Sequence, residues 1–141
     1  MKKILSIIFL LFAFSFANAQ KIKLKKGKVL LDGKELFKYE KEAMGTEFYM
    51  YDLKTDALIL SMQSMDNETR GYIEDDFTKI YFVKEKTTIE TNALHGYSYK
   101  KTIEKLIKRK VIDENGNISE SKLEEFADQY DENITNRTIR N

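Results

Sequence analysis

The stretch KIKLKKGKVLLDGKELFKYE, residues 21–40, decides the fold class of this chain. It opens with a strict alternation that places Ile22 and Leu24 on one face of a strand and lysines on the other. The pair Asp32-Gly33 is a strong signal for a two-residue hairpin turn. Strands joined by turns this short run antiparallel, because a parallel crossover needs about a dozen residues or more. The stretch predicts strands at 21–25, 29–31 and 36–40.

The same pattern continues to about residue 94. Residues 46–52 are rich in aromatic side chains, and residues 57–62 form the most apolar run after residue 20, which is typical of a central strand. Further strands are predicted at 79–83 and 87–91. The chain between residues 20 and 96 therefore predicts an antiparallel meander of six or seven strands, either open or partly rolled.

The period changes near residue 98, which predicts two amphipathic helices. Apolar residues at helical spacing occupy positions 99–107 and 123–130, and Ser121 with Glu124 fits a capping box. Two such helices can cover the apolar face of a sheet. We expect an α+β fold, in which residues 20–141 form one domain: sheet 20–96, helical hairpin 97–132, and a tail 133–141 that is frayed or a short edge strand.

The first twenty residues, MKKILSIIFLLFAFSFANAQ, have the three parts of a secretory signal peptide. Two lysines precede an apolar run, and Ala17 and Ala19 frame a cleavage site. The run is shorter than the roughly 20 residues that a membrane-spanning helix needs. We expect cleavage after Ala19, export, and no transmembrane segment in the processed protein.

Composition excludes several classes of site. The chain has 141 residues, no Cys, one His and a formal net charge of +1. Disulfides, thiolate metal sites, cysteine nucleophiles and lipid-modified cysteines are therefore excluded. The near-neutral charge gives no reason to expect a nucleic acid partner.

Two parts of the sequence are candidates for a functional site, one for calcium binding and one for hydrolysis. Residues 113–124 have Asp, Asn, Asn and Glu at the spacing of a calcium loop, but Ile118 replaces the glycine that the loop requires, so we expect an interhelical turn. The run Glu74-Asp75-Asp76 and the single His95, close to Ser98, are the candidates for hydrolysis. Without a nucleophile elbow or a sugar platform, we expect a solvated acidic run and a loop histidine. No catalytic, cofactor or metal residue is predicted.

The pattern of charges has two possible interpretations, and so does the pattern of aromatic residues. Residues 99–112 are strongly basic and residues 113–132 strongly acidic, so the two helices can attract each other, or the basic helix can dock on an anionic envelope surface. The aromatic group can line a ligand pocket or simply build a half-buried sheet. Its members are Tyr39, Tyr49, Met50, Tyr51, Tyr81 and Phe82.

The segments 17–24 (ANAQKIKL) and 27–34 (GKVLLDGK) resemble small exported proteins of Bacteroidetes-type bacteria, as does the turn Asn115-Gly116-Asn117-Ile118 before a helix. The resemblance implies an exported β-then-α domain, implies no activity, and carries over no functional residue. That group's large C-terminal sorting domain has no counterpart here, which favours the periplasm over the extracellular space.

Three functions remain. The first is a non-enzymatic periplasmic or secreted protein that binds a protein or an envelope component. The second is a small-ligand or lipid carrier with an apolar pocket in a rolled sheet. The third is a hydrolase that uses Glu74, Asp76 or His95.

Overall fold

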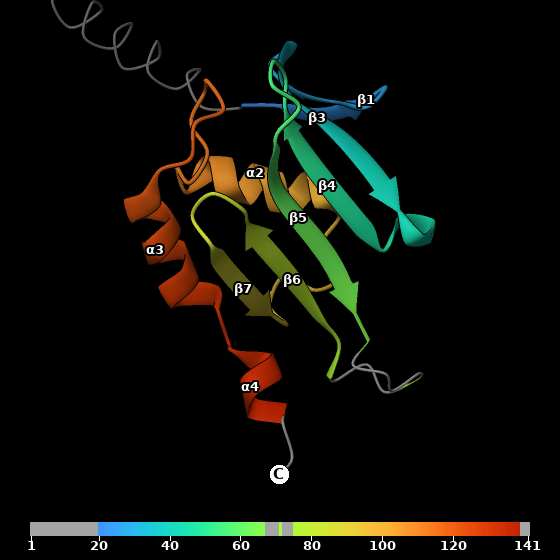
Figure 1. The fold of residues 1–141 in the computed structure, drawn as a ribbon, viewed down its shortest axis with the longest axis vertical. Coiled ribbons are helices and arrows are strands. Elements are labelled where there is room, and N and C mark those ends of the chain that lie inside the picture. The colour runs from blue at the N-terminus through green and yellow to red at the C-terminus, as the bar shows by residue number, and fades with distance from the viewer. Residues whose placement is uncertain (1–19, 67–70, 72–74, 139–141) are drawn as a thin grey trace, which may run out of the picture.

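Seven antiparallel strands form one sheet, in which each strand pairs with the next along the chain (Figure 1). The computed structural model describes residues 20–66, 71 and 75–138. The strands are β1 (Ile22–Lys25), β2 (Lys28–Leu31), β3 (Lys34–Glu42), β4 (Glu47–Asp52), β5 (Leu58–Met65), β6 (Phe77–Phe82) and β7 (Thr87–Thr91). The predicted meander is confirmed with seven strands. Its outer strands β1 and β7 are not paired with each other, so the sheet is open.

The hairpin between β2 and β3 forms where the sequence predicts it. Asp32 and Gly33 have φ values of 50° and 84°, the left-handed conformation that a two-residue turn of this type needs. The Asp32 carboxylate accepts a hydrogen bond of 2.8 Å from the Lys21 N–H, which ties the turn to the start of β1. Local sequence therefore fixes the register of the first three strands.

One face of the sheet carries the hydrophobic core. The cross-strand neighbours Phe48, Met62, Ile80 and Ile89 follow one another across β4 to β7, and all four are fully buried. Irregularities between Val29 and Leu30 and between Met50 and Tyr51 interrupt the ladder. Such bulges increase local twist, which lets the sheet curve around the helices that cover it.

Within the described residues, three helices follow the sheet: α2 (Tyr99–Lys108), α3 (Glu120–Tyr130) and α4 (Ile134–Thr138). Helix α2 lies against β1, whereas α3 and α4 lie against β7 (Figure 1). The buried side chains of α2 and α3 include Ile103, Leu106 and Phe126, which join the core of the sheet. The α+β fold is thus complete, with helices covering the apolar face.

Contacts between α2 and α3 do not depend on opposite charges. The Arg109 guanidinium donates a hydrogen bond to Gln129, and the Lys105 ammonium lies 5.1 Å from the centroid of the Tyr130 ring. No ion pair joins the two helices within the described residues. The opposite charges of the two segments therefore act at longer range, and a cation–π contact and an Arg–Gln hydrogen bond make the direct connection.

Two local predictions are wrong. The N-cap of α3 is Ser119, whose hydroxyl accepts a hydrogen bond from the Lys122 N–H, and Ser121 lies inside the first turn. Helix α3 starts earlier because Ser119 directly follows the bridge between Ile112 and Ile118. Residues 134–138 form a short helix rather than a frayed end or a strand, because Ile134 is buried.

The outer edge of β7 is covered by the segment between α3 and α4. The Asp131 carboxylate accepts a hydrogen bond of 3.0 Å from the Glu90 N–H. The Glu132 N–H donates a hydrogen bond of 2.8 Å to the Glu90 carbonyl. The Glu132 carboxylate also accepts from the Asn92 N–H at 2.5 Å. These bonds satisfy groups that would otherwise be open to strand addition by another chain.

Gly116 provides the first stability prediction. Its φ is +83°, and a Cβ there would lie 3.0 Å from the buried Phe37 ring. We expect Gly116→Ala to lower the free energy of unfolding by about 2–4 kcal/mol, through backbone strain and overpacking. Gly33→Ala is the matched control, since Gly33 has φ +84° and open space around it. Chemical denaturation should give about 1–2 kcal/mol for the control. Equal losses in the two variants would show that the Phe37 contact has no effect.

Candidate functional site

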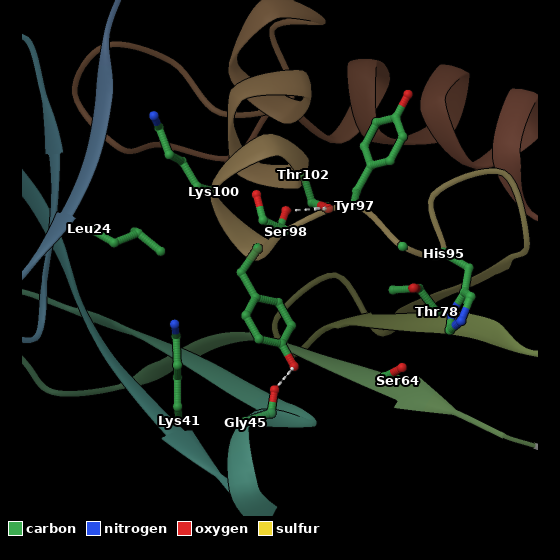
Figure 2. Close-up of a pocket in the computed structure, with 12 residues that line it drawn as sticks. Leu24, Lys41, Gly45, Ser64, Thr78, His95, Tyr97, Ser98, Lys100 and Thr102 are labelled. Carbon is green, nitrogen blue, oxygen red and sulfur yellow. Dashed lines mark hydrogen bonds between the residues drawn. The ribbon is translucent and has the colours of Figure 1, made fainter.

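A cavity of about 660 Å³ lies where the first turn of α2 approaches one end of the sheet (Figure 2). We call it the α2 cavity. Its walls from the sheet include Lys41 of β3, Ser64 of β5 and Thr78 of β6, and its walls from the helix side are residues 95–100 with Thr102. The segment around residue 95 therefore meets parts of the chain far from it in sequence, as the hydrogen bond from Tyr99 to Gly45, 54 residues earlier, shows.

The sheet supplies polar residues to this cavity from its core face. Lys41 pairs with Phe48, and Ser64 pairs with Thr78. By strand alternation Lys41 lies on the same face as Phe37 and Tyr39, and Ser64 on the same face as Leu60 and Met62. The core face thus changes from apolar to polar at its end, and the α2 cavity occupies that polar end.

The first turn of α2 is fixed by its cap. The Ser98 hydroxyl accepts a hydrogen bond of 3.3 Å from the Lys101 N–H, and the Thr102 hydroxyl donates 3.4 Å to the Ser98 carbonyl (Figure 2). Ser98 is thus the N-cap, a position that favours serine because its oxygen satisfies a free helical N–H. The hydroxyl of Ser98 is used structurally.

Tyr99 holds the helix against the sheet. Its ring lies 4.8 Å from the Phe48 ring, which in turn lies 5.3 Å from the Tyr39 ring, centroid to centroid. Its hydroxyl donates a hydrogen bond of 2.7 Å to the Gly45 carbonyl in the β3–β4 turn. Burial, with the nearby Glu47 carboxylate, raises the pKa of Tyr99 above its usual value, so the hydroxyl keeps the proton that it donates.

The cavity has two chemically distinct sides. Lys41, Lys100 and Leu24 lie on one side, which we call the cationic side, while His95, Thr78 and Ser64 lie on the other (Figure 2). The described residues that line the cavity include no Asp or Glu. The arrangement can therefore bind a negatively charged group on the cationic side and hydrogen-bonding groups on the other.

The predicted hydrolytic residues are partly brought together. His95 Nε2 lies 3.7 Å from Asp76 Oδ2, which is a charge contact longer than a hydrogen bond. His95 and Ser98 line the same cavity, but within the described residues no hydrogen bond joins them. Glu74 lies outside the described residues, as do Ala17 and Ala19 of the predicted cleavage site. No acid–base–nucleophile relay is assembled among Asp76, His95 and Ser98.

The calcium-like segment is a turn built around Asp113. The Asp113 carboxylate accepts hydrogen bonds from the N–H groups of Asn115 and Asn117, at 2.8 and 2.9 Å. Burial alone would raise the pKa of Asp113, but these hydrogen bonds outweigh it and hold the pKa below its usual value. The described part of the chain contains no group of three or more His, Asp or Glu side chains placed to hold a metal.

The aromatic group is divided between the two faces of the sheet, and only Tyr39 and Tyr51 share a pocket, of about 500 Å³, that the described residues form. Strand alternation buries Met50 and Phe82 in the core and leaves Tyr49, Tyr51 and Tyr81 on the opposite face of the sheet. The Tyr49 hydroxyl donates a hydrogen bond of 2.8 Å to Glu47, which raises the pKa of Tyr49. These residues build the two faces of the sheet.

Sequence reasoning missed Lys41, Ser64, Thr78 and Lys100 as cavity residues. One signal was present, because Lys41 falls two and four residues after the inward positions of Tyr39 and Phe37. A lysine in a core-facing row indicates the place where the core ends.

No protein-family model, curated protein or solved structure matches this chain. The resemblance to small exported proteins of Bacteroidetes-type bacteria stays a prediction. Among the described residues, none of the helices has the length and apolar character needed to cross a bilayer.

Proposed function

We propose that the protein is a non-enzymatic binding protein of the bacterial envelope and that the α2 cavity is its binding site. The signal-peptide pattern of residues 1–19, with Ala17 and Ala19 at the cleavage site, supports export. Export to the periplasm brings the cavity into contact with envelope components and imported small molecules. The observation that carries the proposal is the cavity itself, whose volume of about 660 Å³ suits a small molecule or an exposed chemical group.

The walls of the cavity are fixed before any ligand arrives, which favours binding. Ser98 and Thr102 hold the first turn of α2, and Tyr99 attaches that turn to the sheet. A pre-formed site loses less conformational entropy when it binds. The use of the Ser98 hydroxyl as a cap argues for binding rather than nucleophilic catalysis.

A lipid carrier with an apolar interior receives less support. The inner face of the sheet is filled by α2 and α3, whose side chains Ile103, Leu106 and Phe126 belong to the core. An apolar ligand enclosed by the sheet would have to displace them. The α2 cavity lies at the edge of this core, where apolar surface from Leu24, Tyr97 and Tyr99 stands beside polar and charged side chains.

Native mass spectrometry tests the proposal. The processed protein is purified from its own periplasm and compared before and after denaturation. We expect a mass shift of a few hundred daltons, the range of a ligand that fills such a cavity, and its loss on denaturation. The shift should disappear in Ser64→Phe, which fills the cavity, and persist in Thr88→Phe, on the opposite face of the sheet. A shift that survives in Ser64→Phe would place the ligand elsewhere, and a bare wild-type protein would count against a tightly bound ligand.

The contact between Asp76 and His95 favours hydrolysis as the second candidate. A histidine beside a carboxylate can act as a general base for a water molecule. Hydrolysis of an ester or amide probe by the wild type, and its loss in His95→Ala, would favour this function. Activity that is equal in the variant would remove His95 from consideration.

A further inference from the structure

We infer that the cationic side of the α2 cavity is a subsite for the phosphate or carboxylate group of an organic anion. This inference rests on the proposed binding function and names its ligand class. It is carried by the juxtaposition of Lys41, Lys100 and the first turn of α2 around one open volume.

Lys41 supplies a cation without a protein carboxylate. Its ammonium lies 5.8 Å from the centroid of the Tyr99 ring, and within the described residues no carboxylate lies within ion-pair distance of it. Lysine ammonium groups bind phosphate and carboxylate as compact point charges. The position of Lys41 on β3, at the polar end of the core face, directs this charge to the cavity.

Lys100 can add a second charge. It lies 3.7 Å from Glu104, its neighbour one helical turn later, and both side chains are more than a third exposed. An exposed pair of this kind contributes little stability, so the ammonium can turn to a ligand at small cost. Figure 2 shows Lys100 and Lys41 on the same side of the cavity.

The backbone at the start of α2 adds to the positive electrostatic potential of the two lysines. The first hydrogen bond of the helix runs from the Thr102 N–H to the Ser98 carbonyl, so the N–H groups of Tyr99 and Lys100 precede the intrahelical ladder. The positive end of the helix dipole therefore faces the cavity that these residues line. It acts here together with two lysines.

The opposite side selects an anion that also carries hydrogen-bonding groups. His95 lines that side, and its Nε2 lies 3.7 Å from Asp76 Oδ2. The hydroxyls of Ser64 and Thr78 lie on that side as well (Figure 2). A hydroxyl can both donate and accept a hydrogen bond, so these two groups can pair with polar groups of a ligand. A polar organic anion fits both sides of the cavity.

The test uses phenyl phosphate and benzoate as anionic probes, and benzamide as a neutral probe of similar shape. Binding to the processed protein is followed through the backbone amide signals of Tyr99, Lys100 and Thr78 in NMR titrations. We expect both anions to shift these signals and benzamide to shift them at least roughly tenfold more weakly, since it lacks the charge. Affinity for the anions should fall as salt is added.

The variant Lys41→Gln should weaken phenyl phosphate binding by roughly five- to tenfold, and Lys41→Arg should restore most of it. Lys54→Gln, an exposed lysine in the turn between β4 and β5, is the matched control and should bind as the wild type does. Thermal melting of each variant checks that it is folded. Equal binding of benzamide and the anions at these amides would overturn the inference while leaving the binding function intact. Absence of any shift with all three probes would contradict both.

The anionic group can belong to a lipid headgroup or to a free small molecule, and vesicle binding distinguishes these two sources. Sedimentation is measured with phosphatidylglycerol and phosphatidylcholine vesicles, each with and without phenyl phosphate. Selective binding to phosphatidylglycerol that phenyl phosphate reverses would identify a lipid headgroup. Binding of phenyl phosphate without vesicle binding would identify a free small anion. Vesicle binding that is equal in Lys41→Gln would show that the cavity is not the lipid site, and would count against the headgroup.

Discussion

Phe48→Ala should lower the free energy of unfolding by about 3–5 kcal/mol and loosen the helical wall of the α2 cavity. Phe48 lies on the central strand β4 and is fully buried. Its ring contacts the Tyr39 ring on one neighbouring strand and the Tyr99 ring of α2, at centroid distances of 5.3 and 4.8 Å. Removal of this ring leaves a void in the sheet and takes away the surface on which the first turn of α2 packs.

Urea denaturation followed by circular dichroism measures the stability loss. Phe48→Leu is the control that keeps most of the apolar bulk, and it should cost less than about 1.5 kcal/mol, because its side chain is apolar and of related size. Tyr99→Phe removes only the hydroxyl that bonds to the Gly45 carbonyl, and should cost about 1 kcal/mol. A Phe48→Leu variant as stable as the wild type would show that the aromatic contacts add nothing beyond apolar burial.

Phenyl phosphate binding distinguishes the packing of Phe48 against Tyr99 from the hydrogen bond that the Tyr99 hydroxyl makes. At a temperature where all variants are folded, Phe48→Ala should lose affinity for phenyl phosphate, because Tyr99 and Lys100 then lose their fixed position. Tyr99→Phe should keep most of that affinity, since its ring still packs on Phe48. Full binding by Phe48→Ala would mean that the cavity does not depend on the aromatic stack.

Much of the fold is local and could therefore be predicted. The alternation of residues 21–25 and the turn at Asp32-Gly33 are set by neighbours in sequence, as are the helical periods of α2 and α3. The end of the chain is different. Helix α4 has five residues, too few to form alone, so its existence depends on contacts with β7 that sequence pattern does not reveal.

The α2 cavity could not be predicted because it depends on register across the sheet. Ser64 faces Thr78 only because the meander aligns β5 with β6, whose paired residues are distant in sequence. The contact of His95 with Asp76 likewise joins a turn after β7 to the residue before β6. Of these cavity residues, only Lys41 could be predicted from the sequence. It lies an even number of residues after Phe37 and Tyr39 and therefore on the same face of the strand.

Glu90→Ala should lower the free energy of unfolding by about 2–3 kcal/mol and release α4 from the sheet. The Glu90 side chain is only 7% exposed, and Lys79 Nζ lies 4.0 Å from its Oε1. Its two carboxylate oxygens accept hydrogen bonds from the Thr135 N–H at 2.7 Å and from the Thr135 hydroxyl at 2.5 Å. Loss of the carboxylate removes both acceptors at the start of α4 and the partner of Lys79.

Denaturation and limited proteolysis together test this role. Glu124→Ala, on the exposed face of α3, is the matched control and should cost less than about 0.5 kcal/mol. Glu90→Gln keeps one acceptor and should fall between the two. In Glu90→Ala the segment 133–138 should become the first site of cleavage, because a short helix without its contacts unfolds locally. The bonds from residues 131 and 132 to β7 use the Glu90 backbone and remain in the variant, so cleavage should stop at α4. If Glu90→Ala were as stable and as protease-resistant as Glu124→Ala, the Glu90 carboxylate would not be what holds α4 in place.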